Sequence, residues 1–226
     1  MLEAAALAQA GCVHGTAVVA EAQTAGIGRQ GHSWHSEPGT GLYVSVVLRL
    51  PLTPTELPIL TLALGLAAGE AVALTSGLAC DLRWPNDILA DGKKVAGILV
   101  QVVDNAAIAG IGINVNHSQF PPDLAAEATS IRIATGREQD REALLSQLLR
   151  SIENVCQLLI TEGKPAILKL LSGASSFAEG KHVRVDLGGG RHLEGVTAGL
   201  TDQGFLQVET PQGNVETIIA GGVRPA

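Results

Sequence analysis

The chain has 226 residues, of which 46% are hydrophobic, and its 15 basic and 22 acidic residues give a net charge of −7. This length fits one medium-sized globular domain with a smaller one beside it. The acidic balance argues against DNA as a partner, because a DNA-binding surface needs many cations to neutralise phosphates. Cys12, Cys80 and Cys156 form no CxxC pair, which predicts buried thiols in a cytoplasmic protein and neither a disulfide framework nor a zinc site.

No segment predicts export or membrane insertion. The start, Met1-Leu2-Glu3, lacks the basic region and the cleavage site of a signal peptide. The longest apolar run covers residues 57–69 and is followed by Glu70. Because a bilayer-spanning helix needs about 20 apolar residues, this run predicts a buried helix.

Apolar periodicity and turn residues predict the following elements in chain order: a helix over 2–10 ending at Gly11, strands over 16–21 and 42–50, a helix over 57–74, strands over 88–90, 95–103 and 107–115, and helices over 142–161 and 165–171. Pro51, Pro54 and Pro58 stand near the start of the second helix, where proline is tolerated. Asp91-Gly92 predicts a tight hairpin. Strands clustered together with helices beside them indicate an α+β fold.

The character of the chain changes after residues 172–176. Short runs over 182–185, 192–196, 205–209 and 215–219 are separated by glycine turns, which is typical of a small β-barrel. We therefore expect a first domain over 1–172 and a second over 177–226.

A glycine-dense loop carries the first candidate site. Gly26, Gly28 and Gly31 allow positive φ and a close approach of backbone N–H groups to phosphate or carboxylate oxygens, and Arg29 adds a permanent positive charge. The same spacing matches the dinucleotide-binding fingerprint, but that motif opens a helix and needs an acid about twenty residues later. Here the only acid between Gly31 and Glu56 is Glu37, so we reject the Rossmann interpretation.

A second candidate site follows at residues 83–99. Pro85 stiffens a turn in which Asn86 and Asp87 present oxygens suited to a ribose, a magnesium ion or an amine. Lys94 enters an otherwise apolar strand just past a hairpin. Because a buried ammonium group needs an anionic partner, Lys94 predicts a phosphate or carboxylate ligand.

Four motifs in order resemble those of biotin protein ligases, and the resemblance covers nearly the whole chain. They are the run 21–31 (EAQTAGIGRQG), the turn 83–87 (RWPND), the strand 94–99 (KVAGIL) and the segment 110–116 (GIGINVN). The resemblance implies a catalytic core related to class II aminoacyl-tRNA synthetases, with a mixed sheet and flanking helices. It further implies that the C-terminal β-module is the family's SH3-like domain.

The resemblance also implies roles for single residues. Those expected to bind biotin are Gln23, Gly26, Ile27, Gly28 and Gly97, together with Arg29 and Lys94 at its carboxylate. Those expected to place ATP are Trp34 against the adenine, Asn86, Asp87 and Asn114, together with Arg29. Mg²⁺ is expected to be held mainly by the phosphates.

The implied reaction adenylates biotin and then transfers it to a lysine of a biotin carboxyl carrier protein or domain. A carboxylate attacking a triphosphate must overcome mutual repulsion, which Arg29, Lys94 and Mg²⁺ offset. No nucleophilic side chain is required. Asp87 is expected to orient the incoming lysine amine in the second step.

The sequence departs from the family pattern in places. The family's Ser-Thr-Asn-like segment does not precede the first helix, so either the natural chain starts further upstream or the biotin pocket is open on that side. Ile27 stands where the family usually has an arginine, and Gln30 and His32 replace further basic residues, so we expect the adenylate to be held less firmly. The chain offers no room for a DNA-binding helix-turn-helix before Thr16, and transcriptional regulation is not expected.

Two alternatives stay open at this point. Lipoate or octanoate transferases share the implied fold, and a catalytically impaired biotin- or nucleotide-binding module is the non-enzymatic alternative. His32 and His35 are interpreted as ordinary loop histidines because no further metal ligand lies beside them in the sequence. Exposed sheet edges would allow a homodimer.

Overall fold

The computed structural model describes the backbone of residues 1–226 and the side chains of all residues except Gln30 and Pro54. The expectations for Gln30 in the loop and for Pro54 at the helix entrance therefore lie outside the described side chains. The helices are α1 (Leu2–Gln9), α2 (Leu57–Ser76), α3 (Ile131–Thr135), α4 (Arg141–Thr161) and α5 (Lys164–Ala174), with short 3₁₀ turns at Arg29–Gly31 and Pro54–Glu56.

The larger sheet contains β1 (Ala17–Ala20), β2 (Gly41–Leu48), β3 (Asp81–Arg83), β4 (Asp87–Ala90), β5 (Lys93–Val103) and β6 (Ala106–Asn114). Their order is β1-β2-β6-β5-β4-β3, and every neighbouring pair is antiparallel. The expected mixed sheet is therefore wrong. Strands β3 to β6 follow one another through short turns, such as Asp91-Gly92 with φ of 49° and 75°, and a tight turn can join only antiparallel strands.

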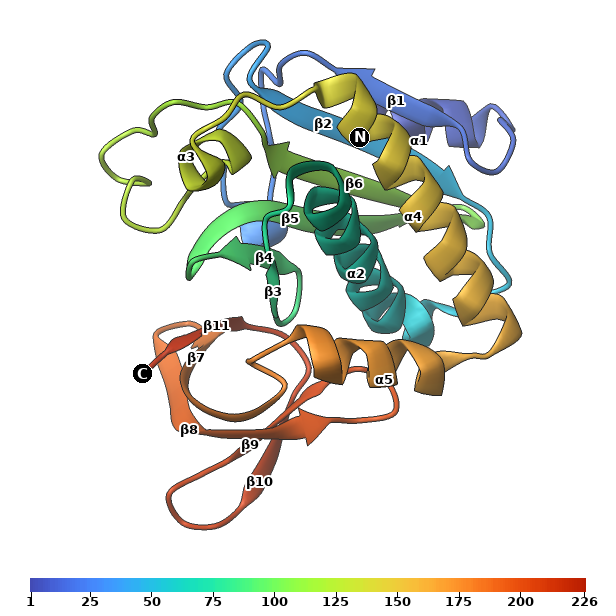
Figure 1. The fold of residues 1–226 in the computed structure, drawn as a ribbon. Coiled ribbons are helices and arrows are strands. Elements are labelled where there is room, and N and C mark those ends of the chain that lie inside the picture. Colours follow the sequence, from blue (N-terminus) through green and yellow to red (C-terminus); the bar gives the residue numbers. More distant parts are fainter.

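The two faces of this sheet are covered differently (Figure 1). Alternate side chains of each strand point to opposite faces. Ala109, Ile111 and Ile113 of β6 join the main core beneath α2 and α4, whereas Ile108 joins a small cluster with Ala4 and Ala8 of α1. Helices α2 and α4 thus close one face, and α1 covers only part of the other.

Helix α2 runs to Ser76, further than the apolar run alone indicates, and ends at Gly77 with φ of 75°. Its 20 residues are apolar enough to cross a membrane, but 61% of the window is buried inside the fold. Figure 1 shows α2 packed between the large sheet, α4 and α5. The helix is therefore the central core helix of a globular fold.

The second sheet contains β7 (Glu179–Gly188), β8 (Arg191–Leu200), β9 (Leu206–Glu209), β10 (Val215–Ile218) and β11 (Gly222–Pro225), in the antiparallel order β10-β9-β8-β7-β11. It is joined to the first sheet by a continuous apolar core. Trp84 Nε1 donates to the carbonyl oxygen of Gly204 at 3.0 Å, and Gly204 packs on Ile59 and Leu62 so closely that a Cβ would come within 2.9 Å of each.

Three features differ from the sequence expectation. Helix α3 is not predicted because its five residues are too few to show periodicity; Ser130 caps it by accepting from the Ile133 N–H. Strand β11 is not predicted because glycine and proline flank it. Of the cysteines, only Cys156 is buried, whereas Cys12 and Cys80 are half-buried.

Candidate active site

A cleft of about 390 Å³ opens on the face of the sheet that α1 leaves uncovered, and it collects predicted site residues from distant parts of the chain. The loop before β2 contributes Gln23, Ile27, Gly28, Arg29 and Trp34. The sheet and its turns contribute Asn86, Asp87, Lys94, Gly97 and Asn114. Gly26 is the one predicted residue that does not line the cleft.

The glycine loop is a tight hairpin. Gly28 N–H donates to the His32 carbonyl at 2.7 Å, and Trp34 N–H donates to the Gly26 carbonyl at 2.9 Å. The expected cradle of free N–H groups is therefore wrong at Gly28, whose donor is already used. Of the three loop glycines only Gly31 has positive φ, at 78°. Gly26 is required for another reason, since a Cβ there would lie 2.7 Å from both Gln23 Oε1 and the Trp34 carbonyl.

Arg29 is held by the turn that follows β3. Its guanidinium donates to Asn86 Oδ1 at 3.3 Å, and Asn86 Nδ2 donates to the Ile98 carbonyl at 2.9 Å. Burial lowers the pKa of Arg29, and the negative charge of Asp87 partly offsets this change. Arg29 remains charged at neutral pH because guanidinium starts from so high a pKa. Both ends of the Asn86 amide are occupied, so Asn86 positions Arg29.

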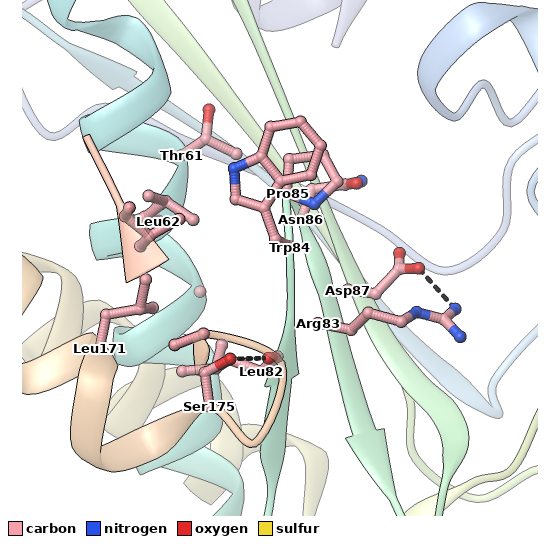
Figure 2. A pocket seen from close by; sticks show the side chains of 13 residues that line it. Thr61, Leu62, Leu82, Arg83, Trp84, Pro85, Asn86, Asp87, Leu171 and Ser175 are labelled. Carbon is pink, nitrogen blue, oxygen red and sulfur yellow. Dashed lines mark hydrogen bonds and ion pairs between the residues drawn. The ribbon is translucent and has the colours of Figure 1, made fainter. Parts of the chain in front are cut away.

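Asp87 lies between two cations. Arg83 donates to its Oδ2 at 2.8 Å, as Figure 2 shows, and Lys94 pairs with its Oδ1. Burial by itself raises the pKa of Asp87, but the charges and hydrogen bonds of Lys94 and Arg83 outweigh it and lower the pKa overall. Arg83, Asp87 and Lys94 are each largely shielded from solvent, with side-chain exposures of 14%, 17% and 29%. Together with Arg29 they form the cationic end of the cleft.

The backbone of Lys94 is fixed from a neighbouring segment. Its N–H donates to the Glu127 carbonyl at 2.7 Å, and its carbonyl accepts from the Thr129 N–H at 2.9 Å. Asn114 is buried beside this bridge, and its Nδ2 donates to the Thr129 carbonyl at 3.0 Å. Asn114 therefore contributes to the site by holding Lys94 in place.

Three glycines lie on the sheet beneath Trp34 and Met1, and two of them, Gly97 and Gly110, line the cleft. Gly97 and Gly112 are paired across β5 and β6, and Gly110 lies two residues along. A Cβ on Gly112 would lie 2.7 Å from the Trp34 ring, one on Gly97 would lie 3.0 Å from it, and one on Gly110 would collide with the Met1 side chain. We call Gly97, Gly110 and Gly112 the glycine shelf. The absence of side chains at these positions lets the Trp34 indole pack directly against the backbone of the sheet.

Trp34 connects the two halves. Lys94 Nζ lies 5.3 Å from the centroid of its ring, within the range of a cation–π interaction. Its Nε1 is buried and has no hydrogen-bond partner among the described side chains. A buried donor without a partner is costly, so this N–H marks a position where a ligand oxygen would be favourable.

Several lining residues were not predicted from the sequence. Arg83 begins the RWPND motif, which by itself indicates no role for this side chain. Glu127 and Arg224 also line the cleft. Arg224 of β11 forms an ion pair with Glu127, which brings the second sheet to the rim. Nothing in the sequence links these two residues, since 97 positions separate them. Four cationic and two acidic side chains line the cleft, so it carries an excess of two positive charges in an acidic protein.

A second, much smaller cavity of about 10 Å³ lies behind the turn at Trp84 and Pro85 (Figure 2). It has room for about one water molecule. Of these two cavities, the larger cleft is the one with room for a substrate.

The loop histidines do not behave as the sequence indicated. Both His32 and His35 line the cleft, and His35 also lies beside Glu37 and His117, with the ligand atoms of these three residues all within 4.8 Å of one another. The expectation that no further metal ligand lies near His35 is therefore wrong, because the fold brings it to a residue 82 positions away.

Comparison with known proteins agrees with this geometry. Residues 5–118 match the biotin/lipoate A/B protein ligase family, and residues 180–223 match the biotin protein ligase C-terminal domain. A bifunctional ligase/repressor from Bacillus spizizenii is 36% identical over 92% of this chain, which spans 65% of that protein's length. A biotin–[acetyl-CoA-carboxylase] ligase from Mycobacterium tuberculosis is 34% identical over 93% of this chain and 79% of its own.

A solved structure supports the same relationship. The biotin protein ligase from Aquifex aeolicus, in complex with biotin and ATP, is similar with a TM-score of 0.84 and 31% identity, covering 96% of this chain and 91% of that one. Two matched regions in order and relatives along nearly the whole chain show that this protein belongs to the biotin protein ligase family.

Proposed function

We propose that this protein is an ATP-dependent biotin protein ligase, which adenylates biotin with release of pyrophosphate and transfers it to a lysine of a biotin carboxyl carrier domain. The observation that carries the proposal is the division of the cleft. A cationic end for charged oxygens adjoins an apolar glycine shelf within a single cavity. The first half-reaction needs such a pair of environments, because an apolar acid must meet a triphosphate.

The cationic end supports the adenylation step by charge. Arg29 and Lys94 would bind the biotin carboxylate and the α-phosphate, and so reduce the repulsion between nucleophile and electrophile. The carboxylate oxygen forms the new bond to phosphorus while the bond to pyrophosphate breaks, and pyrophosphate leaves with the electron pair. Holding the two groups in line accounts for several kcal/mol of the barrier in comparable reactions, about 7–11 kcal/mol at most.

The part of the cleft beside the glycine shelf and Trp34 would accommodate biotin. The cleft near Trp34 is lined by Gln23, Ile27, Gly28 and Gly97. Gly26 lies outside the lining and packs closely against Gln23 and Trp34. The unpartnered Nε1–H of Trp34 would be satisfied by a ligand oxygen. Stacking of Trp34 on adenine and a contact of Asn114 with ATP stay predictions, since the described contacts of Asn114 are with the protein.

Mg²⁺ accompanies the triphosphate in this proposal. The two carboxylates among the lining residues, Asp87 and Glu127, are both ion-paired with cations. Two carboxylates that are already neutralised make a poor dedicated magnesium site, whereas phosphate oxygens suit the ion. When bound, Mg²⁺ would neutralise the charge of the departing pyrophosphate.

Asp87 would serve the second half-reaction by orientation. Its lowered pKa makes it a weak base at neutral pH. Each carboxylate oxygen can still accept a further hydrogen bond beside its cation. We therefore expect Asp87 to align the acceptor lysine amine for attack on the mixed anhydride, with AMP as the leaving group.

We also infer the wider organisation of the protein. Residues 1–172 would form the class II synthetase-like catalytic core, and residues 177–226 an SH3-like module that completes the rim through Arg224. The three free cysteines fit a reducing cytoplasm. The outer edge of β1 offers unpaired backbone groups that a homodimer could use.

Exchange of labelled pyrophosphate into ATP tests the proposal. We expect exchange that depends on biotin in the wild-type chain and is not supported by lipoate or octanoate. Lipoate-dependent exchange would instead make the protein a lipoate ligase of the same fold. Biotin binding with exchange at background level would indicate a binding module without catalysis.

A further inference from the structure

A cluster of metal-ligating side chains borders the cleft, and none of them has a role in the proposed reaction; of the three, His35 also lines the cleft. His35 and Glu37 come from the loop between β1 and β2, and His117 follows β6. Their ligand atoms lie within 4.8 Å of one another. The His35 and His117 ring centroids are 5.8 Å apart, and Phe120 stacks on His117 at 5.1 Å.

His117 is an unusual residue for a purely structural position. It is fully buried, and its Nδ1 has no hydrogen-bond partner among the described residues. Its Nε2 lies 3.5 Å from the Tyr43 hydroxyl, and Ser130 Oγ donates to its carbonyl at 2.7 Å. The hydroxyl beside Nε2 and the hydrogen bond to the His117 carbonyl together fix the orientation of the ring, as the outer contacts of metal-binding imidazoles do.

The surroundings of the His117 ring also suit a metal ligand. The His35 ring is tilted by 50° against it and brings a second nitrogen donor to the same place. Phe120 stacks on the His117 ring with an interplanar angle of 18°. Phe120 and the buried surroundings shield the ring from competing water.

We propose that His35, Glu37 and His117 bind a divalent transition metal, for which Zn²⁺ is the best match. Two imidazoles and one carboxylate with a fourth position left for water form an established zinc donor set, and imidazoles disfavour Mg²⁺ and Ca²⁺. Zn–N distances of about 2.0–2.1 Å require ligand atoms about 3.3 Å apart in a tetrahedron. The ligand atoms now lie within 4.8 Å of one another, so they must approach to reach this separation, and the exposed Glu37 side chain has room to rotate toward the histidines.

The position of the cluster indicates what the metal would do. It joins the loop that carries Arg29 and Trp34 to the segment after β6, which Asn116 N–H already ties to the Thr40 carbonyl at 2.6 Å. A bound ion would add a second link between these segments. We therefore expect Zn²⁺ to restrain the loop without taking part in adenylation.

Equilibrium dialysis of the chelator-treated full chain against Zn²⁺, followed by Co²⁺ absorption spectroscopy, tests the site. We expect one ion per chain, with affinity reduced at least tenfold in H35A and E37Q. H32A is the matched control, since His32 lies in the same loop but outside the cluster. C12S excludes a thiolate site at a half-buried cysteine. H32A and C12S should bind like the wild type.

E37Q keeps the test decisive if H35A does not fold, because Glu37 is exposed and the change is isosteric. The proposal is overturned if no Zn²⁺ binds stoichiometrically, if H35A and E37Q bind as well as the wild type, or if H32A loses as much affinity as they do. None of these results depends on biotin, so they are independent of the pyrophosphate exchange assay.

Limited tryptic digestion provides the second readout. Zn²⁺ should slow cleavage after Arg29 severalfold relative to cleavage after Arg191, which lies exposed in the distant β7–β8 hairpin. The ratio of the two rates corrects for any effect of Zn²⁺ on trypsin itself. E37Q should abolish the protection. An unchanged ratio in the wild-type chain would contradict the restraint of the loop.

Discussion

The two halves of the cleft are built on opposite principles. At the cationic end, Arg29, Arg83, Asp87 and Lys94 are fixed by contacts with one another and with neighbouring polar groups. On the glycine shelf, Trp34 and Met1 can pack directly on the sheet because Gly97, Gly110 and Gly112 have no side chains. Polar sites thus depend on which groups are present, whereas this apolar site depends on groups that are missing. Substitutions at the two ends should therefore fail in different ways.

The largest expected effect is on catalysis at the cationic end. K94A should lower the rate of biotin-dependent pyrophosphate exchange about 10²–10³-fold, because one preorganised charge at the reacting phosphate is lost. K93A is the matched control: Lys93 is adjacent but exposed, and its Nζ contacts the Ala125 carbonyl outside the cleft lining. Equal losses in K93A and K94A would contradict the assignment.

On the shelf, an added methyl group should affect binding more than turnover. G112A places a Cβ 2.7 Å from the Trp34 ring and must displace it. We expect the KM values for biotin and ATP both to rise about 10–100-fold, corresponding to about 1–3 kcal/mol of overpacking, because Trp34 borders the biotin-facing glycines and is predicted to stack on the adenine. G173A, in α5 with no atom near its Cβ, should leave both constants unchanged. Unchanged KM values for both substrates in G112A would contradict the proposed position of Trp34 between them.

The free energy of unfolding should depend on the ion pairs at the cationic end. The pKa of Asp87 is lower in the folded chain, so its ionised form stabilises the fold above the pKa of unfolded aspartate, and this contribution disappears as pH falls through the folded pKa. D87N should cost about 1.5–3 kcal/mol at pH 7, since two charged donors lose their acceptor. Urea titrations should show the difference from wild type shrinking below about pH 4. A difference that does not vary with pH would exclude the ionic explanation.

The smallest effect concerns retention of the adenylate. Ile27 is 60% exposed at the edge of the cleft, so it offers packing contacts but no charge to the adenylate phosphate. I27R should slow loss of the adenylate in single-turnover assays severalfold, about the contribution of one exposed charged contact. Its thermal stability should match wild type, since exposed substitutions change little. If adenylate loss is no faster in the wild type than in I27R, the sequence-based expectation is wrong.

Most of the fold followed from local patterns. The Asp91-Gly92 hairpin and the long helices α2 and α4 lie where periodicity and turn residues place them. The mixed sheet was a wrong expectation. The short connections between consecutive strands indicate antiparallel neighbours, and the structure has these throughout the larger sheet. Helix α3 and strand β11 are too short or too rich in glycine and proline to give a periodic signal.

The site was less predictable than the fold, since its parts meet across the chain. Arg29 and Lys94 stand out in the sequence as cations among glycines or apolar residues. The positioning of Lys94 by Glu127 and Asn114, and the meeting of His35 with His117, depend on how distant segments pack. Hydrogen bonds within the glycine loop were also misjudged, because sequence does not show whether an N–H is already used.

Glu127 is connected at both ends. Its carboxylate holds Arg224 of the last strand, and its carbonyl receives the backbone N–H of Lys94. A shift of the second sheet would therefore be transmitted through Glu127 to the backbone of Lys94. The C-terminal sheet is thus linked to the cationic end of the cleft, although none of the groups proposed to carry out the chemistry belongs to it.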